Sequence, residues 1–186
     1  MKKRCEWPFG NELMITYHDT EWGAPLHNDR KLFEALIIDG FQAGLSWQTI
    51  LNKRENFRKA FDNFDAKKIA TYNSTKKNSL MRDAGIIRNH LKIDSAVDNA
   101  KAFLEIQKEF GSFNKYIWQF VGGKPKKNAW KIMKQIPSTS LESDAMSKDL
   151  KNRGFRFVGS TICYAFMQGT GMVNDHVVFC FRHKEV

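Results

Sequence analysis

The sequence is poor in the features of secreted and membrane proteins. It has three cysteines, an odd number that does not suit the disulfide framework of a small secreted domain. Its first residues, MKKRCEW, lack the apolar run of a signal peptide, and no stretch is long and apolar enough to cross a membrane. We therefore expect a cytoplasmic protein without a membrane partner.

Sustained alternation of apolar and polar residues, which is typical of half-buried strands, is also missing, as are internal repeats and low-complexity tracts. Three-and-four spacing of apolar residues dominates and predicts amphipathic helices separated by Gly, Pro, Ser and Asn. Hydrophobic residues make up 42% of the chain, which is ample for one core. The sequence predicts a single two-lobed, all-α domain over residues 1–186 that acts as a monomer. The expected helices cover residues 29–39, 47–61 (capped by Ser46), 65–72, 93–104, 113–121, 143–152 and 161–168.

Positive charge is in clear excess. The chain has 30 Lys and Arg against 20 Asp and Glu, which gives a formal net charge of +10 and a pI of about 9.6. Much of the excess lies within residues 124–156. This balance favours a polyanionic partner, with nucleic acid as the first candidate, although lysine-rich helix faces are common on proteins that bind none.

A cysteine and a histidine occur together near each end of the chain. Two Cys and two His form one of the common closed tetrahedral zinc sets. His176 and Cys180 would share one face of a helix or tight turn, whereas Cys5 and His18 would have to meet through a loop. The spacing does not match that of zinc-finger pairs. On spacing alone the cysteines, Cys163 included, are better explained as small core residues and the histidines as satisfied polar groups.

A glycine-rich turn joins two expected helices within residues 144–170. One helix ends at Gly154 and the next begins after Gly159, so three backbone amides would be free at a helix N-terminus. Such amides suit a phosphate. The candidate phosphate-binding residues at this turn are Arg153, Arg156, Gly159, Ser160 and Thr161. The segment resembles the DNA-binding hairpin of helix-hairpin-helix proteins, although a plain corner between two helices would use the same glycines.

Residues 39–47 (DGFQAGLSW) form a second unusual segment. We expect a short loop between two helices that brings together the carboxylate of Asp39, the amide of Gln42 and the indole of Trp47. Aromatic and acidic residues also alternate in residues 17–23 (YHDTEWG). Aromatic walls beside a carboxylate can receive a flat, electron-poor ring that donates hydrogen bonds. Most aromatic clusters, however, only fill a core.

Five ordered segments together resemble the type I 3-methyladenine DNA glycosylases. They are residues 17–23, 42–47 (QAGLSW), 83–88 (DAGIIR), 154–164 (GFRFVGSTICY) and 173–176 (VNDH). The resemblance spans nearly the whole chain and implies an all-α helix-hairpin-helix glycosylase that acts on double-stranded alkylated DNA. It also implies that one structural Zn²⁺ joins the two termini. The implied zinc ligands are Cys5, His18, His176 and Cys180.

The same resemblance assigns the residues that contact DNA. Tyr17, Trp22 and Trp47 fall on aromatic positions of the base pocket, and Gly44 and Leu45 fall on the loop that enters the gap in the duplex. Asp39 stands where the family carries Glu and is therefore the implied catalytic, base-reading carboxylate. Because Asp is one methylene shorter, it would reach the base only by a closer backbone or through a bridging water.

The implied function is excision of 3-methyladenine in base excision repair. The enzyme would flip the damaged nucleotide out, hold the cationic base among aromatic rings and hydrolyse the N-glycosidic bond, which releases free 3-methyladenine. Lysine is missing beside the pocket motifs, which favours a monofunctional enzyme, and Asp175 receives only a secondary role because its neighbour His176 is assigned to zinc. Two alternatives stay open: a noncatalytic zinc-stapled module for damaged DNA, and a glycosylase whose base preference is shifted by Asp39.

Overall fold

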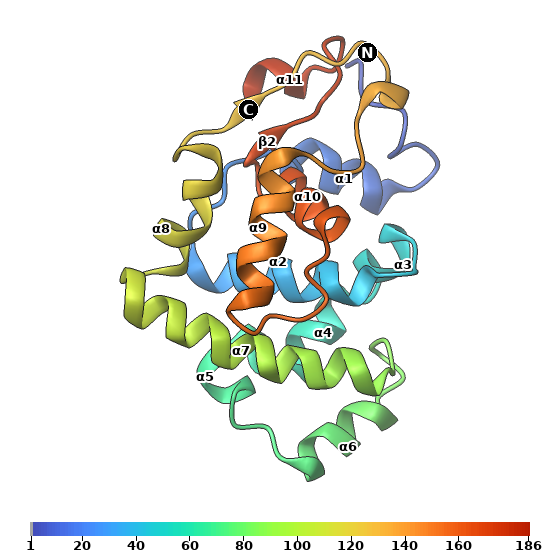
Figure 1. Ribbon diagram of the computed structural model, residues 1–186. Coiled ribbons are helices and arrows are strands. Elements are labelled where there is room, and N and C mark those ends of the chain that lie inside the picture. The colour runs from blue at the N-terminus through green and yellow to red at the C-terminus, as the bar shows by residue number, and fades with distance from the viewer. Residues whose placement is uncertain (1) are drawn as a thin grey trace.

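The computed structural model describes residues 2–186, whose regular elements are nearly all helices (Figure 1). The α-helices are α1 (Glu12–Thr20), α2 (Asp29–Gln42), α3 (Trp47–Leu51), α4 (Arg54–Ala60), α5 (Ala66–Ile69), α6 (Ser74–Arg82), α7 (His90–Phe110), α8 (Phe113–Trp118), α9 (Leu141–Asn152), α10 (Ser160–Gly169) and α11 (Arg182–Glu185). Short 3-10 turns are η1 (Asp62–Phe64), η2 (Gln119–Val121) and η3 (Met133–Gln135). No helix in the described part of the chain is long and apolar enough to span a bilayer.

The helices surround two apolar cores. The larger core lies where α2 contacts α7 and α10, and it is filled by buried side chains such as Leu36, Phe41 and Phe103. The smaller core contains Cys5, Tyr17, Trp22, Leu51, Val177 and Cys180, and therefore joins residues from the two ends of the chain. The elements near the two termini accordingly gather at one end of the molecule (Figure 1).

The all-α prediction is confirmed, with one small exception. Two strands of two residues each, β1 (Lys126–Lys127) and β2 (Val173–Asn174), pair in parallel with Lys126 opposite Val173. A pair this short leaves no alternating pattern in the sequence, because alternation needs at least four residues to be recognised.

Two expectations for residues 39–61 were wrong. The single helix expected over residues 47–61 is broken into α3 and α4, because the backbone amide of Lys53 bonds three residues back and tightens the turn. The Lys53 ammonium then donates to the carbonyls of Ala84 and Gly85. Asp39 does not lie in a loop: α2 continues through Gln42, with Asp39 and Phe41 buried in its last turn, and only residues 43–46 are irregular.

The turn between α9 and α10 is held by two buried polar side chains. The Ser147 hydroxyl donates to the carbonyl of Val158 at 2.6 Å. Asn99, on the neighbouring helix α7, clamps the backbone of Arg156: its Oδ1 accepts from the amide at 2.7 Å and its Nδ2 donates to the carbonyl at 3.0 Å. Gly154, at φ +90°, supplies the left-handed residue that ends α9. The predicted helix–turn–helix arrangement is therefore present, and it is tied to α7.

We expect Asn99→Ala to lower the free energy of unfolding by about 1–3 kcal/mol, because both polar groups of the Arg156 backbone lose their buried partner. Denaturant unfolding measures this loss. Faster hydrogen exchange at the Arg156 amide should accompany it, since that amide would open locally. The exposed Asn78 on α6 is the matched control, and Asn78→Ala should stay within about 0.5 kcal/mol of the parent. Equal stability of the two variants would contradict the clamp.

Candidate active site

Four soft ligands from both ends of the chain meet in the smaller core. Cys5, His18, His176 and Cys180 are all buried, and their ligand atoms lie within 4.8 Å of one another. The Sγ of Cys180 is 3.5 Å from both the Nε2 of His18 and the Nδ1 of His176, and the Sγ of Cys5 is 3.6 Å from that Nδ1. A tetrahedral site with Zn–S near 2.3 Å and Zn–N near 2.0 Å has S···N edges of roughly 3.5 Å. The arrangement could therefore hold a metal ion.

The outer nitrogens of both imidazoles have partners that orient the rings. The Nδ1 of His18 lies 2.8 Å from Asp19, and the Nε2 of His176 lies 2.9 Å from the carbonyl of Trp22. When these outer nitrogens carry the protons, the inner nitrogens present lone pairs to the two thiols, which is the usual arrangement around a metal-bound histidine. His27 and His183 bond elsewhere, to Asn114 and to the carbonyl of Asn128.

A cleft of about 330 Å³ opens beside this cluster, between α1, α2, α3, α10 and η3. Tyr17 and Trp47 face each other at 5.2 Å between ring centroids, and Trp7 packs edge-on against Trp22 at the same distance. The indole nitrogens of Trp7 and Trp47 are buried and find no partner within residues 2–186. The cleft is lined by Trp7, Met14, Tyr17, Trp22, Asp39, Gln42, Trp47, Met133, Ile136, Ala165 and Gln168.

Asp39 reaches this cleft from the last turn of α2. Its side chain is buried, with 6% exposure, and neither of its carboxyl oxygens bonds to a residue in the described part of the chain. Burial alone therefore raises the pKa of Asp39 well above its ordinary value. A buried carboxyl without a partner is a group for which an external hydrogen-bond donor or cation would compensate.

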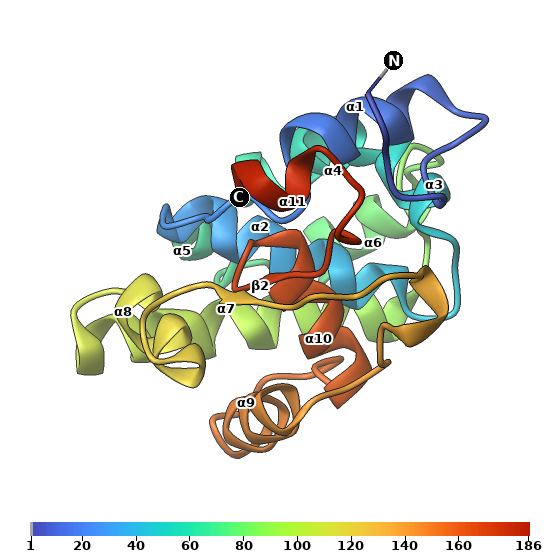
Figure 2. The ribbon, with the colours of Figure 1, turned by 90° about the horizontal axis from the view of Figure 1, so that it is seen from above.

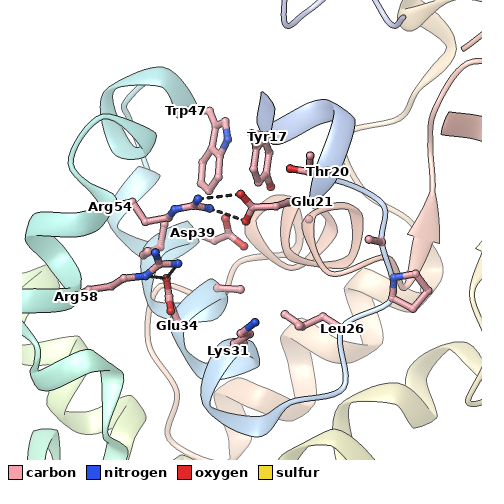
Figure 3. A pocket seen from close by; sticks show the side chains of 15 residues that line it. Tyr17, Thr20, Glu21, Leu26, Lys31, Glu34, Asp39, Trp47, Arg54 and Arg58 are labelled. Carbon is pink, nitrogen blue, oxygen red and sulfur yellow. Dashed lines mark hydrogen bonds and ion pairs between the residues drawn. The ribbon is translucent and has the colours of Figure 1, made fainter. Parts of the chain in front are cut away.

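A second cavity, of about 260 Å³, adjoins the cleft and shares Tyr17, Asp39 and Trp47 with it. Figure 3 shows Asp39 beside an ion pair in which Arg54 donates to both carboxylate oxygens of Glu21, at 2.7 and 2.8 Å. A second pair in this cavity joins Arg58 to Glu34 at 2.7 Å. Because these charges neutralise each other, Asp39 is the unpaired carboxyl between the two cavities.

The structure brings four predicted pocket residues together, since Tyr17, Trp22, Asp39 and Trp47 all line the cleft. Trp7 is a further wall of the same cleft that was not predicted from the sequence. One signal was available. Trp7 lies two residues after Cys5, so a cluster that includes Cys5 also places this indole nearby.

The expected DNA-facing loop lies at the rim of the cleft. Gly44 adopts a φ of +79° and Leu45 is 39% exposed. Lys92 of α7 anchors the loop. It is a buried lysine whose Nζ donates to the carbonyls of Phe41 and Ala43 at 2.9 and 2.6 Å. These bonds complete the C-terminal end of α2 and hold the loop against α7.

The hairpin residues are arranged less simply than expected. Gly159 caps α10, which begins at Ser160, and the Ser160 hydroxyl donates to Asp144. Arg153 is held by Asp149 and Glu109 and lies 5.0 Å over the ring of Phe110 and 5.1 Å over that of Tyr116. Arg156 is more exposed and pairs with Asp98 at 2.9 Å. Both guanidinium groups thus already contact carboxylates.

Asp175 lies at the centre of a hydrogen-bond network. It is fully buried and accepts from four side chains: Asn128, Trp130 and Tyr164 at 2.7 Å, and Gln168 at 2.8 Å. Four donors fix the position of this carboxyl group. Gln168 also lines the cleft, so Asp175 contributes to the site by orienting that amide.

Comparisons with known proteins agree with one another. The methyladenine glycosylase family model matches residues 7–183. DNA-3-methyladenine glycosylase 1 of Escherichia coli is 47% identical over 178 residues, 96% of this chain and 95% of that protein. The Haemophilus influenzae DNA-3-methyladenine glycosylase is 45% identical over 180 residues, 97% of each chain.

Solved structures give the same picture. A crystal structure of 3-methyladenine DNA glycosylase I superimposes with a TM-score of 0.94 at 46% identity, covering 96% of this chain and 98% of that one. The Staphylococcus aureus enzyme, whose structure is described as the structural basis of 3-methyladenine recognition, gives a TM-score of 0.93 at 32% identity. It covers 96% of this chain and 95% of its own.

We expect Asp39→Asn to raise the free energy of unfolding at neutral pH. The unfolded chain releases the Asp39 proton near the ordinary pKa of about 3.9, whereas the folded protein holds it to higher pH. Between these two pKa values the folded state binds more protons, so its stability falls as pH rises. Asn carries no charge, so the advantage of the variant should grow from about pH 4 to about pH 7.5.

Denaturant unfolding at the two pH values tests this expectation. Glu105→Gln changes an exposed carboxyl of α7 and is the control, for which no comparable pH-dependent difference is expected. An Asp39→Asn variant that is less stable than the parent at neutral pH would show that the carboxylate has a stabilising partner.

Proposed function

Because this chain belongs to the methyladenine glycosylase family and is a DNA glycosylase, we propose that it excises 3-methyladenine from alkylated DNA by flipping the damaged nucleotide into the aromatic cleft. The observation that carries the proposal is Asp39, a buried carboxyl that has no partner among residues 2–186 and lies in a cleft walled by Tyr17, Trp22 and Trp47. The relatives named for this activity support the choice of base.

The cleft suits a cationic purine. Methylation at N3 leaves the adenine of DNA positively charged, and the faces of Tyr17 and Trp47 attract such a ring. Ionised Asp39 accepts from the exocyclic amine, directly or through one water. Binding of a cation also favours the charged form of Asp39, which offsets the burial that otherwise raises its pKa.

The same contacts account for catalysis. The glycosidic bond to a cationic base is already weak, so the departing base needs little acid assistance and recognition of the extruded nucleotide supplies much of the rate. The free indole N–H groups of Trp7 and Trp47 are further donors toward the flipped nucleotide. The lining of the cleft includes no lysine, so direct hydrolysis is favoured over an imine intermediate and strand cleavage.

Two surfaces hold the duplex in this proposal. Leu45, on the loop anchored by Lys92, fills the gap left by the flipped nucleotide, and Gly44 gives that loop its left-handed turn. The N-terminal amides of α10, from Gly159 to Thr161, face a backbone phosphate. Arg156 would exchange Asp98 for a phosphate, whereas Arg153 is held by two carboxylates and two rings and contributes chiefly to the hairpin.

The Cys/His cluster is proposed to hold one structural Zn²⁺. The two thiols and two imidazole nitrogens form a complete four-ligand set with the expected S···N edges, which leaves no open position for a catalytic water. When bound, the ion neutralises the thiolates and links the ends of the chain. The residues of the cleft, and not the ion, contact the base.

Release of free base tests the proposed function. Purified enzyme should release 3-methyladenine from methylated duplex DNA, detected by chromatography. Asp39→Asn replaces a charged acceptor by an amide, which loses about 1.5–3 kcal/mol and should slow release about tenfold to a hundredfold. Asp39→Glu should preserve or raise activity.

Each other outcome has a distinct meaning. DNA binding without release of any base would identify a noncatalytic module. Preferential release of another methylated base would show that Asp39 shifts the preference. Equal release by the parent and Asp39→Asn would mean that Asp39 does not contact the base.

Metal analysis tests the zinc site. Protein purified without added metal should carry one zinc per chain, and Cys5→Ser or Cys180→Ser should lower both the zinc content and the melting temperature. Cys163→Ala is the matched control, because Cys163 is buried away from the cluster and bonds to the carbonyl of Val158. It should keep its zinc. Parent protein far below one equivalent, with Cys5→Ser unchanged in stability, would contradict the proposal.

A further inference from the structure

A groove of about 320 Å³ lies beside the Cys/His cluster, outside the cleft and the hairpin. It is bounded by the N-terminal segment, by residues 131–133 and by the turn that precedes Cys180. We call it the N-terminal groove. The residues that characterise it are Lys2, Lys3, Phe9, Lys131, Ile132 and Phe179.

Large apolar side chains are unusually exposed in this groove. Phe9, Ile132 and Phe179 expose 60%, 54% and 63% of their surface. They come from three separate segments of the chain, yet the fold gathers them along one groove. Clustered exposed apolar residues with a polar rim mark a binding surface, whereas single ones need no explanation.

The polar rim of the groove is basic. Lys2, Lys3 and Lys131 are exposed, and none of them takes part in an ion pair within residues 2–186. The neighbouring Arg4, in contrast, is committed to Asp19, and Glu6 is the one acidic residue of the lining. Unpaired lysines around apolar rings complement a strand of nucleic acid, which offers phosphates for the ammonium groups and sugar edges for the rings.

The groove is continuous with the cleft that is proposed to receive the base. Met133 lines both of them. Both ribbon views place η3, drawn in orange, on the same side of the molecule as α3, which follows the loop over residues 43–46 (Figures 1 and 2). A duplex whose extruded nucleotide occupies the cleft would therefore continue past the groove.

From these observations we propose that the N-terminal groove is a further DNA-contact surface that holds the backbone flanking the extruded nucleotide. Lys2, Lys3 and Lys131 bind phosphates, and the apolar side chains contact deoxyribose edges. This inference rests on the proposed function, because it places the groove relative to a nucleotide in the cleft.

The first test removes the three lysines together. The Lys2→Ala, Lys3→Ala, Lys131→Ala variant should bind damaged and undamaged duplex more weakly and with a shallower salt dependence. Each lost phosphate contact lowers the slope of log K against log salt by about 0.9, so a decrease of about 2 to 3 is expected. The matched control removes the same charge elsewhere by Lys59→Ala, Lys67→Ala and Lys101→Ala, which are exposed on α4, α5 and α7.

A second measurement locates the contact along the DNA. Two duplexes are compared. One carries a flipped-nucleotide analogue near one end, and the other carries it near the opposite end. The parent should bind the duplex that extends past the groove more tightly, and the triple variant should lose this difference. Phe9→Ala with Phe179→Ala should weaken binding without changing the salt slope, because it removes apolar contacts and no charge.

The outcomes separate this inference from the proposed function. Lys3 lies two residues from Cys5, so zinc content and free 3-methyladenine binding are measured on the triple variant and should match the parent. If the triple variant loses zinc, the single variant Lys131→Glu is tested in its place. If the parent releases no base, the proposed function fails. If the parent is active and the groove variants keep the salt slope and end preference of the control, the groove does not bind DNA and the inference is overturned.

Discussion

The contact between the two ends of the chain is the constraint on which the rest of the site depends. His18 and Tyr17 are consecutive on α1, so the turn that directs His18 into the Cys/His cluster also directs Tyr17 into the cleft. The carbonyl of Trp22 lies at the outer nitrogen of His176, which fixes the next aromatic wall to the same cluster. Trp7 follows Cys5. Tyr17, Trp22 and Trp7 are thus positioned by residues that are not themselves in the cleft, whereas Trp47 comes from α3.

At Asp39 the structure gives up stability of the free protein for a group that can bind a ligand. Most buried polar groups of this chain have partners, as Asn99 and Asp175 illustrate with two and four bonds. Asp39 has none from the described residues, and its burial disfavours the charged form. Such a group destabilises the free protein, so its place at the shared wall of two cavities is most simply explained by a ligand that completes its bonding.

The hairpin changes the interpretation of the arginines beside it. Arg153 and Arg156 were expected to meet phosphate directly, yet three carboxylates hold them in the free protein. These carboxylates therefore offset two of the positive charges at the hairpin, which carries part of the basic character predicted from the net charge of +10. Unpaired lysines at the N-terminal groove carry part of it, which spreads the electrostatic attraction over a larger surface.

By itself the sequence determined the local structure and the chemical character of the site. Period and caps located the long helices, because apolar spacing and capping residues act over a few neighbours. The helices α2, α7 and α10 contain the expected residues 29–39, 93–104 and 161–168 but extend beyond them, and Ser46 caps α3 as predicted. The order of the five motifs indicated the family, because each motif is a continuous stretch of sequence that can be recognised without the tertiary structure. Spacing could not decide whether Cys5 and His176 meet, because 171 residues separate them and only the packing of both termini brings them to 3.6 Å. The break at Lys53, the continuation of α2 through Asp39, the partners of Arg153 and Arg156, and the groove beside the cluster were likewise decided by tertiary contacts. Except for Asp149, which lies only four residues from Arg153, the deciding partner lies far along the chain or the burial comes from other helices, so no local pattern records it.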